Sequence, residues 1–117
     1  MNLKENKEIK EILENVKIGM IDYIEPGETE YTESDVEKCI SIMNNFLSEI
    51  SNSDSREIGM QSVKKVVIEL NKLNEECEYE IIETDQREQL AEIIIIAGSL
   101  KGYNNKNEDI TEQWRDW

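Results

Sequence analysis

The fold class of this chain depends on one stretch, Gln86-Arg87-Glu88-Gln89-Leu90-Ala91-Glu92-Ile93-Ile94-Ile95-Ile96-Ala97. Its four consecutive isoleucines are apolar on every side, so a buried strand and a buried helix both fit them. Leu90 and Ala97 continue the apolar pattern at helical spacing, which favours a helix. We predict a helix that begins at an N-cap on Thr84 and ends at Gly102, a residue type common just past the last helical turn. Because it is apolar all round, it should be the most buried helix.

Three further helices are predicted upstream, from about Leu3 to Ile21, from Ser34 to Ile50 and from Ser55 to Cys77. In each segment apolar residues recur every three or four positions, the spacing of one buried helix face. Pro26-Gly27 and a polar loop at residues 51–55 mark the first two breaks. Ser34 with Glu37 matches a capping box, in which each side chain bonds the other residue's backbone N–H.

Four helices with short connections predict an all-α, antiparallel four-helix bundle that forms a single helical domain over residues 1–117. The end of the chain, Thr111-Glu112-Gln113-Trp114-Arg115-Asp116-Trp117, predicts a short aromatic turn or helix capped by Asp109 or Thr111. We expect Trp114 to pack back onto the bundle, whereas Trp117 is also a candidate anchor for a partner. Gly98 is expected to let a neighbouring helix come close.

Negative charge is unevenly distributed in the sequence. The formal charge is −14 over 117 residues, and eleven of the 27 acidic residues fall in two short stretches. The first comprises Glu25, Glu28, Glu30, Glu33 and Asp35, and the second Glu75, Glu76, Glu78, Glu80, Glu83 and Asp85. In an up-down-up-down bundle both stretches belong to connections at the same end of the molecule.

Part of this acidity has a structural explanation, since acids near helix N-termini interact favourably with the helix dipole. Glu75, Glu76 and Glu78 surround a predicted helix C-terminus, where the same dipole disfavours them. Concentrated like charge repels itself and attracts a basic partner. The alternatives are a solvated surface and a partner-binding site, for which the candidate residues are Glu25, Glu28, Glu30, Tyr31, Glu33, Glu75, Glu76, Glu78, Tyr79, Glu80 and Trp117.

The composition argues against most other functions. The chain has no histidine, and Cys39 and Cys77 lack the spacing of a zinc site, so both cysteines are expected to be reduced core residues. No catalytic motif, Ca²⁺ loop or phosphate-binding loop is present, which predicts a non-enzyme without metal or cofactor. A pI near 4.3 disfavours nucleic acids and anionic membranes as partners. The N-terminus has no apolar signal segment, so we expect a cytoplasmic protein.

Two segments carry a resemblance to other proteins. Leu73-Asn74-Glu75-Glu76-Cys77-Glu78-Tyr79-Glu80-Ile81-Ile82-Glu83-Thr84-Asp85-Gln86-Arg87-Glu88 and residues 109–117 resemble small acidic bacterial proteins. Some proteins of that kind are similar to the immunity proteins of toxin systems. The resemblance implies partner binding rather than catalysis, and it carries over no catalytic residue.

The sequence therefore predicts a small acidic, non-catalytic binding protein, of the immunity type, that covers a basic partner such as a nuclease toxin. A homo-oligomeric regulatory or scaffold module is an alternative, which a concentration-dependent mass would reveal. A hydrolase with carboxylate-bound Mg²⁺ is another, which metal-dependent thermal stabilisation would reveal.

Overall fold

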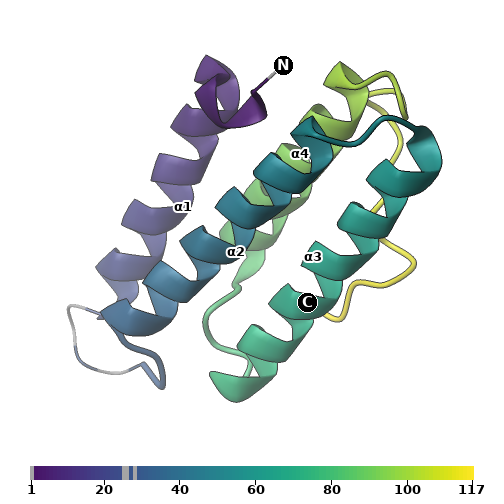
Figure 1. Cartoon of the computed structure of the whole chain (residues 1–117). Coiled ribbons are helices and arrows are strands. Elements are labelled where there is room, and N and C mark those ends of the chain that lie inside the picture. The colour runs from purple at the N-terminus through teal and green to yellow at the C-terminus, as the bar shows by residue number, and fades with distance from the viewer. Residues whose placement is uncertain (1, 25–26, 28) are drawn as a thin grey trace.

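The computed structural model describes every residue except 1, 25, 26 and 28 (Figure 1). A short 3-10 helix, η1 (Leu3–Glu5), precedes four α-helices, and the described residues contain no strand. The helices are α1 (Lys7–Ile24), α2 (Glu33–Ser51), α3 (Arg56–Glu76) and α4 (Thr84–Leu100). The predicted all-helical fold is confirmed, and the four isoleucines lie within α4.

The helices alternate in direction along the bundle (Figure 1). Helix α1 packs against α2 and α4, and α2 packs against α3. Helices α3 and α4 approach each other less closely. Residues 101–117, which we call the tail, contact both of these helices and occupy the seam between them (yellow in Figure 1). The bundle is therefore closed on its fourth side by an irregular segment.

The faces of α4 differ in burial. Leu90, Ile93 and Ile94 are fully buried in the core, whereas Ile95 is only half-buried and lies on the outer face.

Cys39 and Cys77 are buried free thiols, as predicted. Burial raises the pKa of Cys39 to about 12 and that of Cys77 to about 11, so both thiols are protonated at neutral pH.

No described helix has the length and apolar character needed to cross a membrane.

The helix boundaries correct two of the predicted N-caps. Helix α2 begins after Thr32, whose backbone N–H donates to Asp35 Oδ2 at 3.0 Å, so the capping pair lies two residues before the predicted Ser34 and Glu37. An acidic side chain at the third helical position can accept a hydrogen bond from the backbone N–H of the N-cap residue three positions before it. At α4 the N-cap is Glu83, and Thr84 is already helical. Gly102, with φ of +78°, follows α4 as predicted.

Two glycines admit the tail into its seam. A Cβ on Gly59 of α3 would overlap the ring of Tyr103, and a Cβ on Gly98 of α4 would overlap Asn104 and press on Ile110. The expectation that Gly98 admits a neighbouring helix is therefore wrong. A helix cannot approach there because the tail already fills that space.

Side chains and the final turn then fix the tail. Asn71 of α3 donates from Nδ2 to the carbonyl of Trp114 at 2.8 Å and accepts from the N–H of Asp116 at 2.9 Å. The predicted C-terminal turn is present at residues 111–114, and Asp109 accepts from the N–H of Thr111 at 3.0 Å. Both tryptophans pack against the core, which confirms the prediction for Trp114.

Candidate functional site

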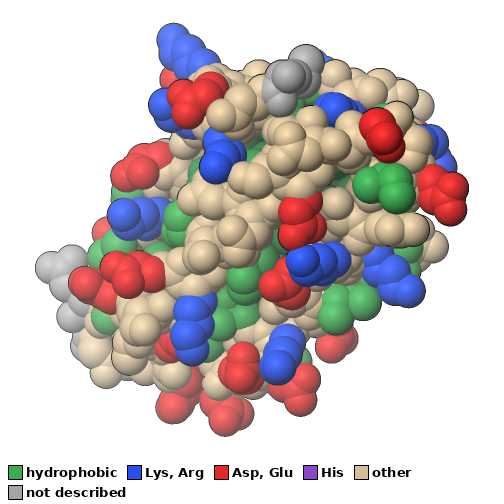
Figure 2. Space-filling view, viewed as in Figure 1, with side chains coloured by type: hydrophobic (Ala, Val, Ile, Leu, Met, Phe, Trp, Pro, Cys, Tyr) green, Lys and Arg blue, Asp and Glu red, His purple; other side chains and the backbone are tan. Residues whose placement is uncertain are grey.

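The α1–α2 and α3–α4 connections lie at the same end of the bundle, which we call the acidic end (Figure 1). The acidic end comprises the nine described acids of the two stretches. Red side chains gather along the lower edge of Figure 2, where these connections lie. Glu25 and Glu28 lie outside the described residues. The other nine are Glu30, Glu33, Asp35, Glu75, Glu76, Glu78, Glu80, Glu83 and Asp85. Asp35 and Glu80 are half-buried, and the remaining seven are exposed.

The two connections influence each other electrostatically. Burial, together with the negative charge of Glu83 and, more weakly, of Glu80, raises the pKa of Tyr31 to about 12. The pKa of the Cys77 thiol is raised first by burial and then by Asp35, at the start of α2. Carboxylates from one connection thus act on groups of the other. The predicted convergence of the two acidic stretches is confirmed by this proximity.

Lys38 and Lys72 lie near this end, where they line a groove with Glu76, but no described base forms an ion pair with the acids there. The three ion pairs found among the described residues join Lys10 to Glu5, Lys65 to Glu49, and Arg115 to Asp109. None of them involves an acid of the acidic end. The negative charge there is consequently available to an external partner or to solvent.

Tyr31 anchors the first connection instead of facing a partner. Its side chain is only 3% exposed, and its hydroxyl donates to the carbonyl of Met20 at 2.8 Å. The prediction that Tyr31 supplies a partner contact is therefore wrong for its side chain. A tyrosine can bury its ring when its hydroxyl finds a hydrogen-bond partner, and here that partner is the carbonyl of Met20 in α1.

The second connection is anchored by buried residues on both sides of its exposed tip. Ile81 and Ile82 are buried, and the N–H of Ile82 donates to the buried side chain of Asn74 at 3.1 Å. Between these anchors Tyr79 is 55% exposed. Tyr79 is therefore exposed among the acids, and its role as a contact group stays a prediction.

Helix α3 ends in a Schellman motif, the arrangement in which the first two residues past the cap bond back to the last turn. Glu78 N–H donates to the carbonyl of Glu75 at 3.1 Å, and Tyr79 N–H donates to that of Asn74 at 2.7 Å. Glu78 and Tyr79 have φ of +56° and +61°, where most residues other than glycine are strained. This geometry turns the chain sharply and sends Glu78 and Tyr79 outward.

Relieving this strain should stabilise the protein. We expect Glu78→Gly to raise the free energy of unfolding by about 0.5–1 kcal/mol relative to Glu78→Gln, because glycine adopts positive φ without a steric penalty. Glu78→Gln is the matched control, since it removes the charge but keeps the side chain. Urea unfolding followed by circular dichroism measures the difference, and equal stabilities of the two variants would contradict the strain.

Trp117 belongs to a different part of the structure from the other candidates. It is half-buried against the core, and the guanidinium of Arg115 lies 5.5 Å from the centre of its ring. Its indole Nε1 is buried without a hydrogen-bond partner among the described residues. The tail, and not the acidic end, therefore holds Trp117, and its role as an anchor stays a prediction.

Within the described part of the chain, no group of three or more carboxylates or thiols is arranged to hold a metal ion. Sequence reasoning missed a groove beside the tail, to which α4 contributes Arg87 and the tail contributes Lys106 and Arg115. These residues are far apart in sequence, and no motif joins them. Only the position of the tail brings them together.

Comparisons with protein-family models, with curated proteins and with solved structures each return no match for this chain. The likeness of residues 73–88 and 109–117 to small bacterial proteins therefore remains a resemblance. The function has to be argued from the geometry of the chain itself.

Proposed function

We propose that the protein is a small, non-catalytic binding protein whose acidic end covers a basic surface of a partner protein. The observation that carries the proposal is the convergence of nine carboxylates from two connections and the adjoining helix ends, with no ion pair to any described base. Opposite charge would accelerate encounter with a basic partner, an effect that ranges from about 10-fold to 10³-fold in charged complexes. Tyr79 would add apolar contact within the charged surface.

An immunity-type inhibitor that covers a nuclease toxin is the specific form of this proposal. A nuclease active site is basic because it binds phosphates, so an acidic surface can compete with the nucleic acid for it. Anchoring by Tyr31 and Asn74 supports such a role, since a surface ordered in advance loses less entropy when it binds. The protein would remain in the cytoplasm with its partner.

The test uses charge reversal at two sets of exposed positions. One variant carries Glu30→Lys and Glu78→Lys in the acidic end, and its matched control carries Glu11→Lys and Glu57→Lys elsewhere, with the same change in net charge. The candidate partner is the product of the neighbouring gene, because a toxin and its antidote are expected to be encoded together. Binding is measured by surface plasmon resonance at low and high salt.

We expect the first variant to associate about tenfold more slowly than the control at low salt, with the gap shrinking as salt screens the charges. Equal rates for the two variants would contradict binding through the acidic end. Self-association of the unmodified chain without capture of the partner would favour the homo-oligomeric alternative instead. Inhibition of the partner's activity by the unmodified chain would then establish the immunity role.

A further inference from the structure

A groove of about 560 Å³ lies between the start of α1, the outer face of α4 and the tail. Its volume falls in the range of about 300–1,000 Å³ that is usual for ligand sites. Ala91, Ile95 and Ile96 of α4 supply its apolar lining. None of the nine described acids of the acidic end lines the groove, although Arg87 lies only two residues after Asp85.

Basic and acidic side chains both line this groove, three of the former and four of the latter. Arg87, Lys106 and Arg115 all line it, and they include two of the three arginines in the sequence. Arg87 and Lys106 make no ion pair with any described acid. Arginine is the side chain best suited to bind a carboxylate, because its planar donors match the two carboxylate oxygens.

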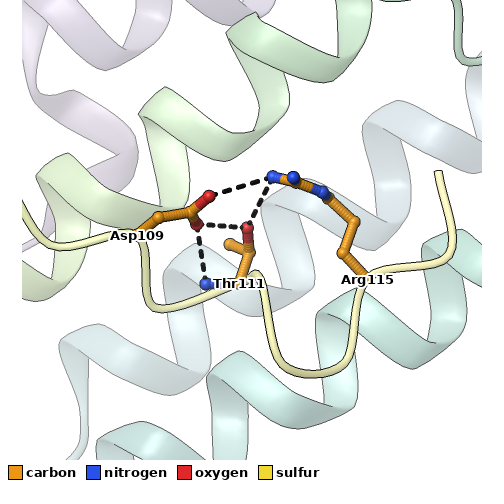
Figure 3. Close-up of polar contacts among 3 residues, drawn as sticks. All are labelled: Asp109, Thr111 and Arg115. Atoms are coloured by element: carbon orange, nitrogen blue, oxygen red, sulfur yellow. Dashed lines mark hydrogen bonds and ion pairs between the residues drawn. The ribbon is translucent and has the colours of Figure 1, made fainter.

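The guanidinium of Arg115 is held in place by its neighbours (Figure 3). Its Nη1 donates to Asp109 Oδ2 at 3.0 Å and to Thr111 Oγ1 at 3.3 Å, and its flat face lies over Trp117. The hydroxyl and N–H of Thr111 also donate to Asp109, at 2.6 and 3.0 Å. Burial alone would raise the pKa of Asp109, but these hydrogen bonds and the charge of Arg115 outweigh it and lower the pKa.

Only part of Arg115 is used by this network. Its Nη2 and Nε make no hydrogen bond to any described residue, so a rigidly held arginine keeps donors for a ligand. Donors fixed in advance bind an anion with little loss of side-chain entropy.

The same groove also presents carboxylates. Glu8 of α1 and Glu88 and Glu92 of α4 line it, and all three are exposed and without an ion-pair partner in the described part of the chain. A ligand with only negative charge would be repelled by these three carboxylates, and one with only positive charge would be repelled by the two arginines. A ligand that carries both charges satisfies both sets of residues.

We propose that this groove binds a short peptide with free amino and carboxyl ends. Arg87 and Arg115 would receive its carboxylate, Glu88 and Glu92 its amino group, and Ile95 and Ile96 its apolar side chains. From Arg87 to Glu92, the groups assigned to the two ends of the peptide, α4 rises about 7.5 Å at 1.5 Å per residue, so a peptide of two to three residues fits. The proposal rests on no property of the acidic end and stands independently of it.

The test uses the full chain and three forms of trileucine: with both ends free, with the amino end acetylated, and with the carboxyl end amidated. Binding is measured by isothermal titration calorimetry and by tryptophan fluorescence, which reports on Trp117 beside Arg115. We expect the free peptide to bind and each blocked form to bind at least about tenfold more weakly, the loss typical of one charge-assisted contact.

Variants separate the groove from the rest of the surface. Arg87→Gln should weaken binding of the free peptide about tenfold and bring it close to that of the amidated form. The matched control is Lys64→Gln, an equal charge change at an exposed position of α3 outside the groove. The exposed side chain of Arg87 makes no hydrogen bond or ion pair with any described residue, so its replacement should leave the unfolding midpoint unchanged.

Three results would overturn the proposal. The first is no binding of the free peptide at millimolar concentration, and the second is equal binding of all three forms, which would indicate apolar adhesion alone. The third is an equal effect of Arg87→Gln and Lys64→Gln. None of these results bears on the acidic end, so they are distinguishable from failure of the proposed function.

Discussion

Replacing Ile94 with alanine is expected to lower the free energy of unfolding by about 2–5 kcal/mol, the usual result of truncating a fully buried isoleucine. Ile94 has no exposed surface and lies in the core-facing part of α4. The loss has two sources, the apolar surface that is no longer removed from water and the cavity left behind. Because small domains are stable by only about 5–15 kcal/mol, this single change would remove a large part of the total.

Ile95→Ala is the matched control, since the same atoms are removed from the next residue of the same helix. Ile95 is half-buried and lines the groove, so the loss should be less than half of that for Ile94→Ala. Urea unfolding followed by circular dichroism gives both values. Equal losses of unfolding free energy in Ile94→Ala and Ile95→Ala would contradict the difference in burial between these two positions of α4.

Replacing Gly98 with alanine should also destabilise the protein, by about 1–3 kcal/mol, the usual result of overpacking a core position. In a helix exposed to solvent the same substitution would stabilise by about 1 kcal/mol, because alanine is the better helix former. At this position the added Cβ would overlap Asn104 and lie 3.2 Å from Ile110 Cδ1. The Asn104 side chain must move to accommodate it, which breaks its hydrogen bond to the carbonyl of Ile95, or the tail must shift away from α4.

Fluorescence distinguishes displacement of the tail from general destabilisation. Both tryptophans of the chain lie in the tail, so a red shift of their emission in Gly98→Ala, before any loss of helical signal, would report its release. Ser99→Ala, at the adjacent half-buried position, should change stability by less than about 0.5 kcal/mol and leave the emission unchanged. A more stable Gly98→Ala variant would show that the tail does not pack there.

The helices were predictable because their evidence is local. Ile93–Ile96 could be assigned to a helix from Leu90, Ala97 and the preceding residues 86–92, and the order of the helices placed both acidic stretches at one end. The cap at Thr32 was missed because Ser34 with Glu37 satisfies the same pattern two residues later. Such boundary shifts depend on small energy differences between neighbouring caps.

The tail and Tyr31 could not be predicted in the same way, because their burial depends on contacts distant in sequence. Residues 103–110 have no helical periodicity, and Gly98 gives no sign that its partner is a loop instead of a helix. Tyr31 lies among acids, which made it look exposed, yet the carbonyl of Met20 accepts its hydroxyl in the core. The groove beside Arg115 was missed for the same reason, since the tail forms one of its walls.

The position of the tail has a consequence for synthesis on the ribosome. Helices α1 to α4 are complete once Leu100 has been made, but the seam between α3 and α4 stays open until Ile110 and Thr111 have emerged to fill it. Because the chain leaves the ribosome from its N-terminus, α4 emerges before the tail. Until the tail follows, the seam exposes apolar core surface to which a chaperone can bind.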